Sequence, residues 1–305
     1  MKKFAPWLVL AGVLMGVGAY RFRTRPYDAA RLMQCLPPDR SLHVYLDVGL
    51  LRSSGILDLI AGSPGLEEPD YKQFVEGTGF DYRTDLDAVA IAFRDDDIFY
   101  AVQGRFDEQK LMDYARSHGG SCEHVLCSLP GSTPGRTTSF YMIRAGVLAL
   151  ASSHGPSAGD MIAPGAWTEA PKIPTAAIWV SAPPYVFANP ESLPTGSRAF
   201  LAPLAQARQT YFTLGPGSGD GFALKMEVTT DTAKAAEALR KDLADNTELL
   251  NSMLRREKMT PNAGDLSGVL TKGEFVAAGP KVTATWPIER SFVEALAKGG
   301  VTTSE

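Results

Sequence analysis

Residues 86–104 have the sequence LDAVAIAFRDDDIFYAVQG, in which two apolar runs flank a short polar stretch. Runs rich in Val, Ile, Phe and Tyr on either side of a turn are typical of a β-hairpin. We expect strands over Leu86 to Phe93 and Ile98 to Gly104, joined by the turn Arg94 to Asp97. Because the two strands of a hairpin run in opposite directions, this stretch predicts an antiparallel sheet.

Other parts of the chain repeat this signal. Further strand pairs are expected at 139–143 with 147–151, 209–214 with 222–228, and 274–278 with 281–286. Single strands are expected at 42–48 and around 176–180, where apolar and polar residues alternate. Helices are expected at 49–61, 71–76, 198–207, 231–257 and 289–298, and another helix is expected to begin at Asp107 as its N-cap.

Each half of the chain therefore follows the order strand, helix, hairpin, helix, hairpin, helix, which predicts a tandem duplication with little surviving identity. The expected fold class is α+β, with two similar antiparallel-sheet modules and packed helices behind an N-terminal membrane segment. The expected division is a signal or anchor over 1–25, a tether over 26–40, a first module over 41–165 and a second module over 174–299.

The N-terminal segment indicates membrane targeting. The stretch from Phe4 to Tyr20 carries no charge and follows Lys2 and Lys3. Its length is slightly below the roughly 20 apolar residues that cross a bilayer. The bulky residues expected to contact lipid are Phe4, Trp7, Leu8, Leu10, Leu14 and Tyr20.

Two fates of this segment stay open. Val17 and Ala19 provide the small-residue pattern of a signal-peptidase site, which predicts secretion after cleavage near Ala19. Alternatively, an uncleaved segment would anchor the chain in the inner membrane with its globular part in the periplasm or outside. The arginines at 21, 23 and 25 balance the charge on both sides, so the positive-inside rule does not fix the orientation.

The amino-acid composition of the chain is typical of globular proteins. The chain has 305 residues, 45% of them hydrophobic and 21% charged, with a formal charge of −4. Its Lys and Arg residues are scattered, so we expect no nucleic-acid partner. We expect no cofactor, because no Walker loop or other cofactor motif is present.

Two of the three cysteines lie in the densest candidate cluster of the sequence. His118, Cys122, His124 and Cys127 could together ligate a soft metal, although their spacing differs from that of structural zinc sites. A disulfide between Cys122 and Cys127 is the simpler interpretation in an exported protein, with free thiols as a further alternative. Cys35 would then have no partner.

Catalytic signatures are missing from the sequence: there is no nucleophile elbow, no His-Glu-x-x-His motif and no Ser-x-x-Lys motif. We therefore expect a non-catalytic binding or scaffolding module with a protein or small-molecule partner. The alternative is a hydrolase of the cell envelope whose site lies between the two modules and includes His118 or His124.

Three stretches carry a resemblance. They are Leu36 to Asp39 with the following strand 42–48, Thr78 to Tyr82, and Gly104 to Asp107. They resemble uncharacterised bacterial proteins that have an N-terminal anchor and a large envelope-facing region. The resemblance covers mainly the first half. It implies an envelope location and no known activity.

Overall fold

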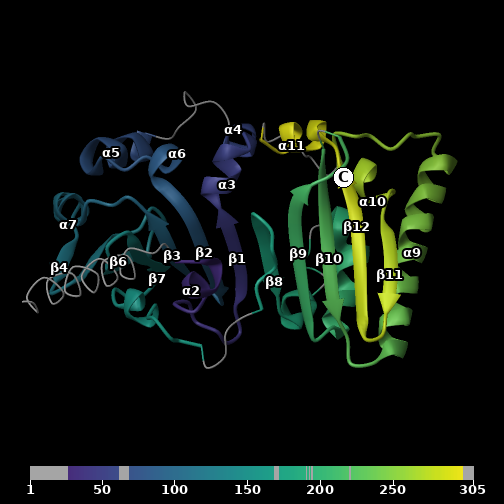
Figure 1. Cartoon of the computed structure of the whole chain (residues 1–305), viewed down its shortest axis with the longest axis horizontal. Helices are drawn as coiled ribbons and strands as arrows, with labels where there is room; N and C mark the ends of the chain where they lie inside the picture. The colour runs from purple at the N-terminus through teal and green to yellow at the C-terminus, as the bar shows by residue number, and fades with distance from the viewer. Residues whose placement is uncertain are drawn as a thin grey trace, which may run out of the picture.

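All strands belong to one sheet. The computed structural model describes residues 27–61, 69–167, 172–189, 191, 193, 195–219 and 221–297. Within them, twelve strands form an antiparallel sheet in the order β11-β12-β10-β9-β8-β1-β2-β3-β7-β6-β5-β4, with several helices packed against it (Figure 1). The α+β class and the antiparallel pairing are confirmed, and the expectation of two separate sheets is wrong.

The strands lie close to the predicted hairpins. The first half of the chain supplies β1 (Leu42–Asp47), β2 (Leu86–Arg94), β3 (Asp97–Gly104), β4 (Ser121–Glu123), β5 (Leu126–Pro130), β6 (Thr137–Arg144) and β7 (Val147–Ser153). The second half supplies β8 (Ile178–Ala182), β9 (Gln209–Pro216), β10 (Phe222–Thr229), β11 (Glu274–Ala278) and β12 (Lys281–Ile288). The short β4–β5 hairpin was not predicted.

The helices connect these strands. The α-helices are α2 (Ala29–Met33), α3 (Val48–Ser53), α4 (Ile56–Ala61), α5 (Pro69–Thr78), α6 (Tyr82–Asp85), α7 (Glu108–Ser117), α8 (Arg198–Leu201), α9 (Ala233–Arg256), α10 (Leu266–Leu270) and α11 (Arg290–Ala297). Short 3₁₀ turns add η2 (Ala158–Met161), η3 (Pro184–Phe187), η5 (Thr195–Ser197) and η6 (Ala202–Gln206). The predicted N-cap is confirmed, since the Asp107 carboxylate accepts a hydrogen bond from the Lys110 backbone N–H at 3.2 Å.

One face of the sheet is covered by helices in both halves. In the second half α9 packs on it through Ala236, Leu239 and Leu243, which are spaced by threes and fours and are buried. In the first half α3, α4 and α7 cover the same face. Burial of these apolar stripes is the main stabilising term, at about 25 cal/mol per Å² of apolar surface.

Among the described residues, those that cover the opposite face pack mainly on the first half. There α2 and the residues after it place Leu32, Met33 and Leu36 on small strand residues such as Ala90 and Ala101. Leu32 and Leu36 are fully buried. The expectation that 26–40 is a tether is therefore wrong for this part, because these residues belong to the core.

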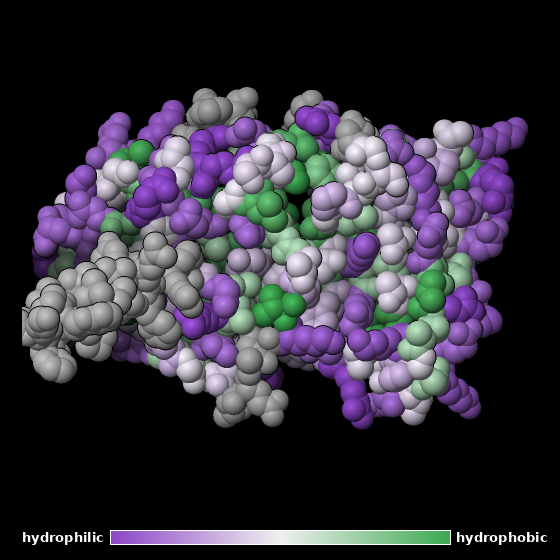
Figure 2. Space-filling view, in the orientation of Figure 1, coloured by the Kyte–Doolittle hydropathy of each residue, from purple (hydrophilic) through white to green (hydrophobic). Residues whose placement is uncertain are grey.

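In the second half this opposite face is polar. Tyr211, Glu227 and Thr283 lie in register across β9, β10 and β12. The Glu227 carboxylate pairs with the Lys281 ammonium at 2.9 Å. Figure 2 shows mainly hydrophilic and neutral residues over this part of the molecule. On this face of the sheet, the covered part in the first half therefore borders an open part in the second half.

The two halves meet along β1 and β8, which we call the seam. These strands pair antiparallel, with His43 opposite Ser181 and Tyr45 opposite Trp179. Above them α11, from the end of the chain, contacts α4, from its beginning (Figure 1). Outward from the seam the strand order is β1-β2-β3-β7-β6-β5-β4 on one side and β8-β9-β10-β12-β11 on the other, so the first half has the additional β4–β5 hairpin at its edge.

Candidate functional site

A cavity of about 200 Å³ opens at the seam, at the boundary between the covered and the open part of this face of the sheet. Its floor consists of neighbouring strand residues that share one face: His43 on β1, Trp179 and Ser181 on β8, and Gln209 and Tyr211 on β9. Met33 of α2 and Trp167, which precedes β8, form a wall. We call this cavity the seam pocket.

His43 is buried at the floor of the seam pocket, with 4% of its surface exposed. Its Nε2 lies 3.0 Å from the Pro37 carbonyl oxygen, which can only accept, so Nε2 carries the proton. Burial lowers the pKa of His43, and the hydrogen bond to Pro37 opposes this shift. The ring is therefore neutral at pH 7, with Nδ1 as its acceptor.

Trp167 stands beside His43, with ring centroids 5.3 Å apart and planes tilted by 52°. Its indole N–H donates to the Leu36 carbonyl oxygen at 2.9 Å, which fixes the ring against α2. The wall of the pocket is thus a rigid aromatic surface. Such a surface favours contact with a flat, partly apolar molecule.

Three polar side chains of β8 and β9, Ser181, Gln209 and Tyr211, lie side by side on the floor of the seam pocket. The Gln209 amide nitrogen donates to the Ser181 hydroxyl at 2.8 Å. Burial raises the pKa of the Tyr211 phenol, and a hydrogen bond from Ser181 partly offsets that rise. The phenol therefore stays protonated at neutral pH.

The charged residues of the seam pocket are cations. Arg40 and Lys172 line it, and among the residues that the structure describes no aspartate or glutamate does so. Arg40 precedes β1, where its backbone carbonyl accepts from the Tyr185 hydroxyl at 2.8 Å. Lys172 also borders a neighbouring groove over β9 and β10 that contains Glu227.

A hollow of opposite charge lies further along β1 on the same face. It is lined by Asp28, Asp47 and Asp87 and has a volume of about 610 Å³. Tyr45, stacked on Trp179 at 5.6 Å, separates it from the seam pocket. Burial, with Asp47 and Asp28 nearby, raises the pKa of Tyr45 to about 12.

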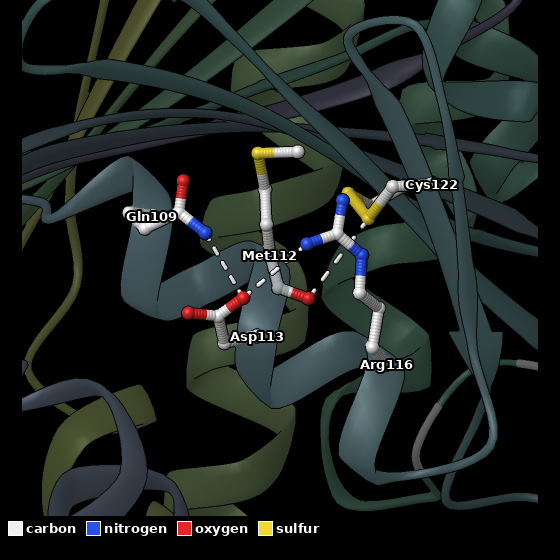
Figure 3. Close-up of a disulfide and its surroundings, with 6 residues drawn as sticks. Gln109, Met112, Asp113, Arg116 and Cys122 are labelled. Carbon is white, nitrogen blue, oxygen red and sulfur yellow. Dashed lines mark hydrogen bonds and ion pairs between the residues drawn. A yellow bond between two sulfur atoms is a disulfide. The ribbon is translucent and has the colours of Figure 1, made fainter.

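The predicted cysteine pair forms a disulfide. Cys122 and Cys127 face each other across the β4–β5 hairpin with Cα atoms 4.0 Å apart. Figure 3 shows the bond beside α7, where the Asp113 carboxylate accepts from Gln109 and pairs with Arg116 at 3.3 Å. Both sulfurs are bonded, so neither is available as a thiolate ligand. Cys35 is free and buried, and burial raises its pKa to about 11.

The two histidines of the candidate cluster lie apart from the seam. His118 caps the end of α7 and stacks on Tyr114, with ring centroids 3.9 Å apart. His124 occupies the β4–β5 turn with a φ of 55°. The described residues contain no group of three or more His, Cys, Asp or Glu that could hold a metal ion. A site between the halves that includes His118 or His124 is not formed, because β4 is the edge strand whereas the seam is central.

The residues predicted to contact the membrane or to be cleaved lie outside the described residues. They are Phe4, Trp7, Leu8, Leu10, Leu14, Val17, Ala19 and Tyr20. From Tyr27 onward, in the ranges described, no helix is both long and apolar enough to cross a membrane.

Sequence reasoning missed the seam pocket. Its residues come from four segments of the chain, and no motif links them. The alternating pattern of 42–48 predicts a strand with one polar face, on which His43 would be half-exposed, but His43 is buried because α2 and the chain after it cover this face of β1. The spacing of Leu32, Met33 and Leu36 was the available signal that this segment packs on the sheet.

The chain was compared with protein-family models, curated proteins and solved structures. No protein-family model matches the chain, and no curated protein matches it. The chain is similar to a solved structure described as "Structure of crystal form IV of TP0453", with a TM-score of 0.48 and 12% identity, over 93% of this chain and 100% of that chain. A likeness at this level says nothing about function.

Proposed function

We propose that this protein is a non-catalytic binding module of the cell envelope whose binding site is the seam pocket. The observation that carries the proposal is the seam pocket itself. Aromatic, hydroxyl, amide and cationic side chains converge there from β1, β8 and β9 and from the segments that precede β1 and β8. Concave sites with a few convergent polar groups are the usual binding sites of proteins.

The proposal includes a tandem duplication. The two strand orders that run outward from the seam support it, because each begins with a single strand, continues with a hairpin, and then places a later hairpin outside the first. In both halves a helix, α7 or α9, stands between the two hairpins. The junction of two similar halves is a suitable place for a binding site, since both halves contribute side chains there.

The envelope location rests on two supports. The sequence 1–25 has the pattern of a signal or anchor. The Cys122–Cys127 disulfide is of a kind that persists in oxidising compartments. We propose that residues 1–25 attach the protein to the membrane or direct its export, and that the seam pocket faces the periplasm or the outside.

Fluorine NMR can test the binding site, because the tryptophans report on different places. Trp167 and Trp179 line the seam pocket, whereas Trp286 lies in the core beneath α9 and serves as an internal control. The full chain, which also contains Trp7, is labelled with 5-fluorotryptophan, and Trp7→Phe, Trp167→Phe and Trp286→Phe variants assign the four signals. A library of small metabolites is then screened.

We expect binders that shift the Trp167 and Trp179 signals and leave Trp286 in place. If every binder shifts Trp286 or none of these three signals, the seam pocket is not the binding site. A library without any binder would count equally against the proposal.

A further inference from the structure

The charged residues around the seam pocket indicate which charge its ligand carries. Arg40 and Lys172 line the cavity, and within the described ranges neither has a carboxylate on the cavity wall. Glu227, a carboxylate of the adjoining groove that lies opposite Tyr211 in the sheet, is paired with Lys281 at 2.9 Å. The acidic residues Asp28, Asp47 and Asp87 gather in the other hollow, behind Tyr45. An anion is therefore favoured in the seam pocket, and a cation is not.

The floor of the seam pocket offers a hydroxyl donor to a ligand. Ser181 accepts from the Gln209 amide at 2.8 Å, and Tyr211 lies directly opposite Ser181 on β9 and lines the cavity. Burial raises the pKa of the Tyr211 phenol, so the phenol is protonated at neutral pH and its O–H can donate to a bound molecule. A donor at this place is complemented by an acceptor, and a carboxylate oxygen is a strong one.

The aromatic wall and the volume set the size of the ligand. Trp167 is held in place by its bond to the Leu36 carbonyl and stands 5.3 Å from the His43 ring. The cavity of about 200 Å³ holds roughly seven water molecules at about 30 Å³ each. This is room for a single ring with one substituent, and it is below the range of about 300–1,000 Å³ typical of drug-sized ligands.

We propose that the seam pocket binds a small organic anion with one planar ring, of the class of aromatic carboxylates. The ring lies against Trp167 and His43, and the carboxylate accepts from Tyr211 and faces Arg40 and Lys172. This inference rests on the proposed function, because it names the ligand class of the same site.

Three single-ring probes of similar size and different charge test the ligand class. Benzoate, benzamide and benzylamine are titrated into the full chain labelled with 5-fluorotryptophan, with Trp167 and Trp179 as reporters. We expect benzoate to bind at least about tenfold more tightly than benzamide, the gain of one charge-assisted contact, and benzylamine not to shift these signals.

Two variants and a control locate the contacts. Arg40→Gln keeps most of the side chain and removes its charge, and Tyr211→Phe keeps the ring and removes the donor. Each variant should weaken benzoate binding roughly tenfold, because one charge-assisted hydrogen bond is lost. The affinity for benzamide should change by less than about threefold. Arg208→Gln, an exposed arginine paired with Asp231 outside the cavity, should leave benzoate binding unchanged.

The outcomes separate the two proposals. Tighter binding of benzamide or benzylamine at Trp167 and Trp179 would overturn the proposal that the ligand is an anion. The seam pocket would still be a binding site. Equal losses for benzoate and benzamide in Arg40→Gln would also overturn it. If none of the probes shifts these signals at millimolar concentration, the inferred ligand class is wrong, and the library screen alone then decides the proposed function.

Discussion

His43 is a buried residue of the seam that contacts the segments packed around it. Its Nε2–H is held by the Pro37 carbonyl, its ring contacts Trp167, and it faces Ser181 across the seam. A strand position with alternating neighbours predicted only that His43 lies on one face of a sheet. Part of its cover comes from the nearby residues 33–38, but Trp167 and the partner strand β8 lie more than a hundred residues away, so the pattern around His43 could not reveal that the ring is buried.

The pH dependence of stability follows from this burial. The pKa of His43 is lowered below the ordinary value of 6.5 in the folded protein. As the pH falls below about 6.5, the unfolded chain gains a proton that the folded protein resists, so stability falls by at most about 1.4 kcal/mol per pH unit from this residue. Above that pH the residue is neutral in both states and contributes no pH dependence.

We therefore expect His43→Gln to lose less stability than the parent chain between pH 7.5 and 5.5, measured by urea unfolding. His154→Gln, at an exposed histidine, is the matched control and should follow the parent chain. Parallel pH profiles of the parent chain and His43→Gln would show that burial of this ring does not control acid stability.

At the scale of elements, the sequence predicted the long hairpins and the long helix well. These elements have strong local signals: β2 and β3 are rich in β-branched and aromatic residues, and α9 has a regular apolar stripe after the N-cap Thr232. The β4–β5 hairpin and α10 were missed, because they have three to five residues each and too few apolar positions for a period.

The β4–β5 hairpin owes part of its stability to its disulfide. Closing a loop of this length removes entropy from the unfolded chain worth roughly 2 kcal/mol. We expect the double variant Cys122→Ala, Cys127→Ala to lose about that much free energy of unfolding in urea. Cys35→Ala is the control for loss of a buried sulfur without loss of a bond.

Mass spectrometry checks the pairing directly. Alkylation of the denatured, unreduced chain should modify one of the three cysteines, and alkylation after reduction should modify all three. Modification of all three cysteines without reduction would contradict the disulfide and weaken the proposed envelope location.

At the scale of the molecule, the sequence predicted two modules, whereas the strands form a single sheet. The pairing of β1 with β8 depends on backbone hydrogen bonds between strands that no short-range signal connects. Both strands have apolar residues on one face and His43, Tyr45, Trp179 or Ser181 on the other, which suits a central strand as well as an edge strand. The seam, and with it the pocket, could therefore not be predicted from local patterns.

A crystal structure of the full chain with the tightest ligand from the fluorine screen tests the central claim most directly. We predict ligand density in the cavity between β1, β8 and β9, in contact with Trp167 and Gln209. Density elsewhere, for example on the exposed apolar residues Leu249 and Met253 of α9, with the seam pocket empty, would contradict the claim that the seam is the binding site.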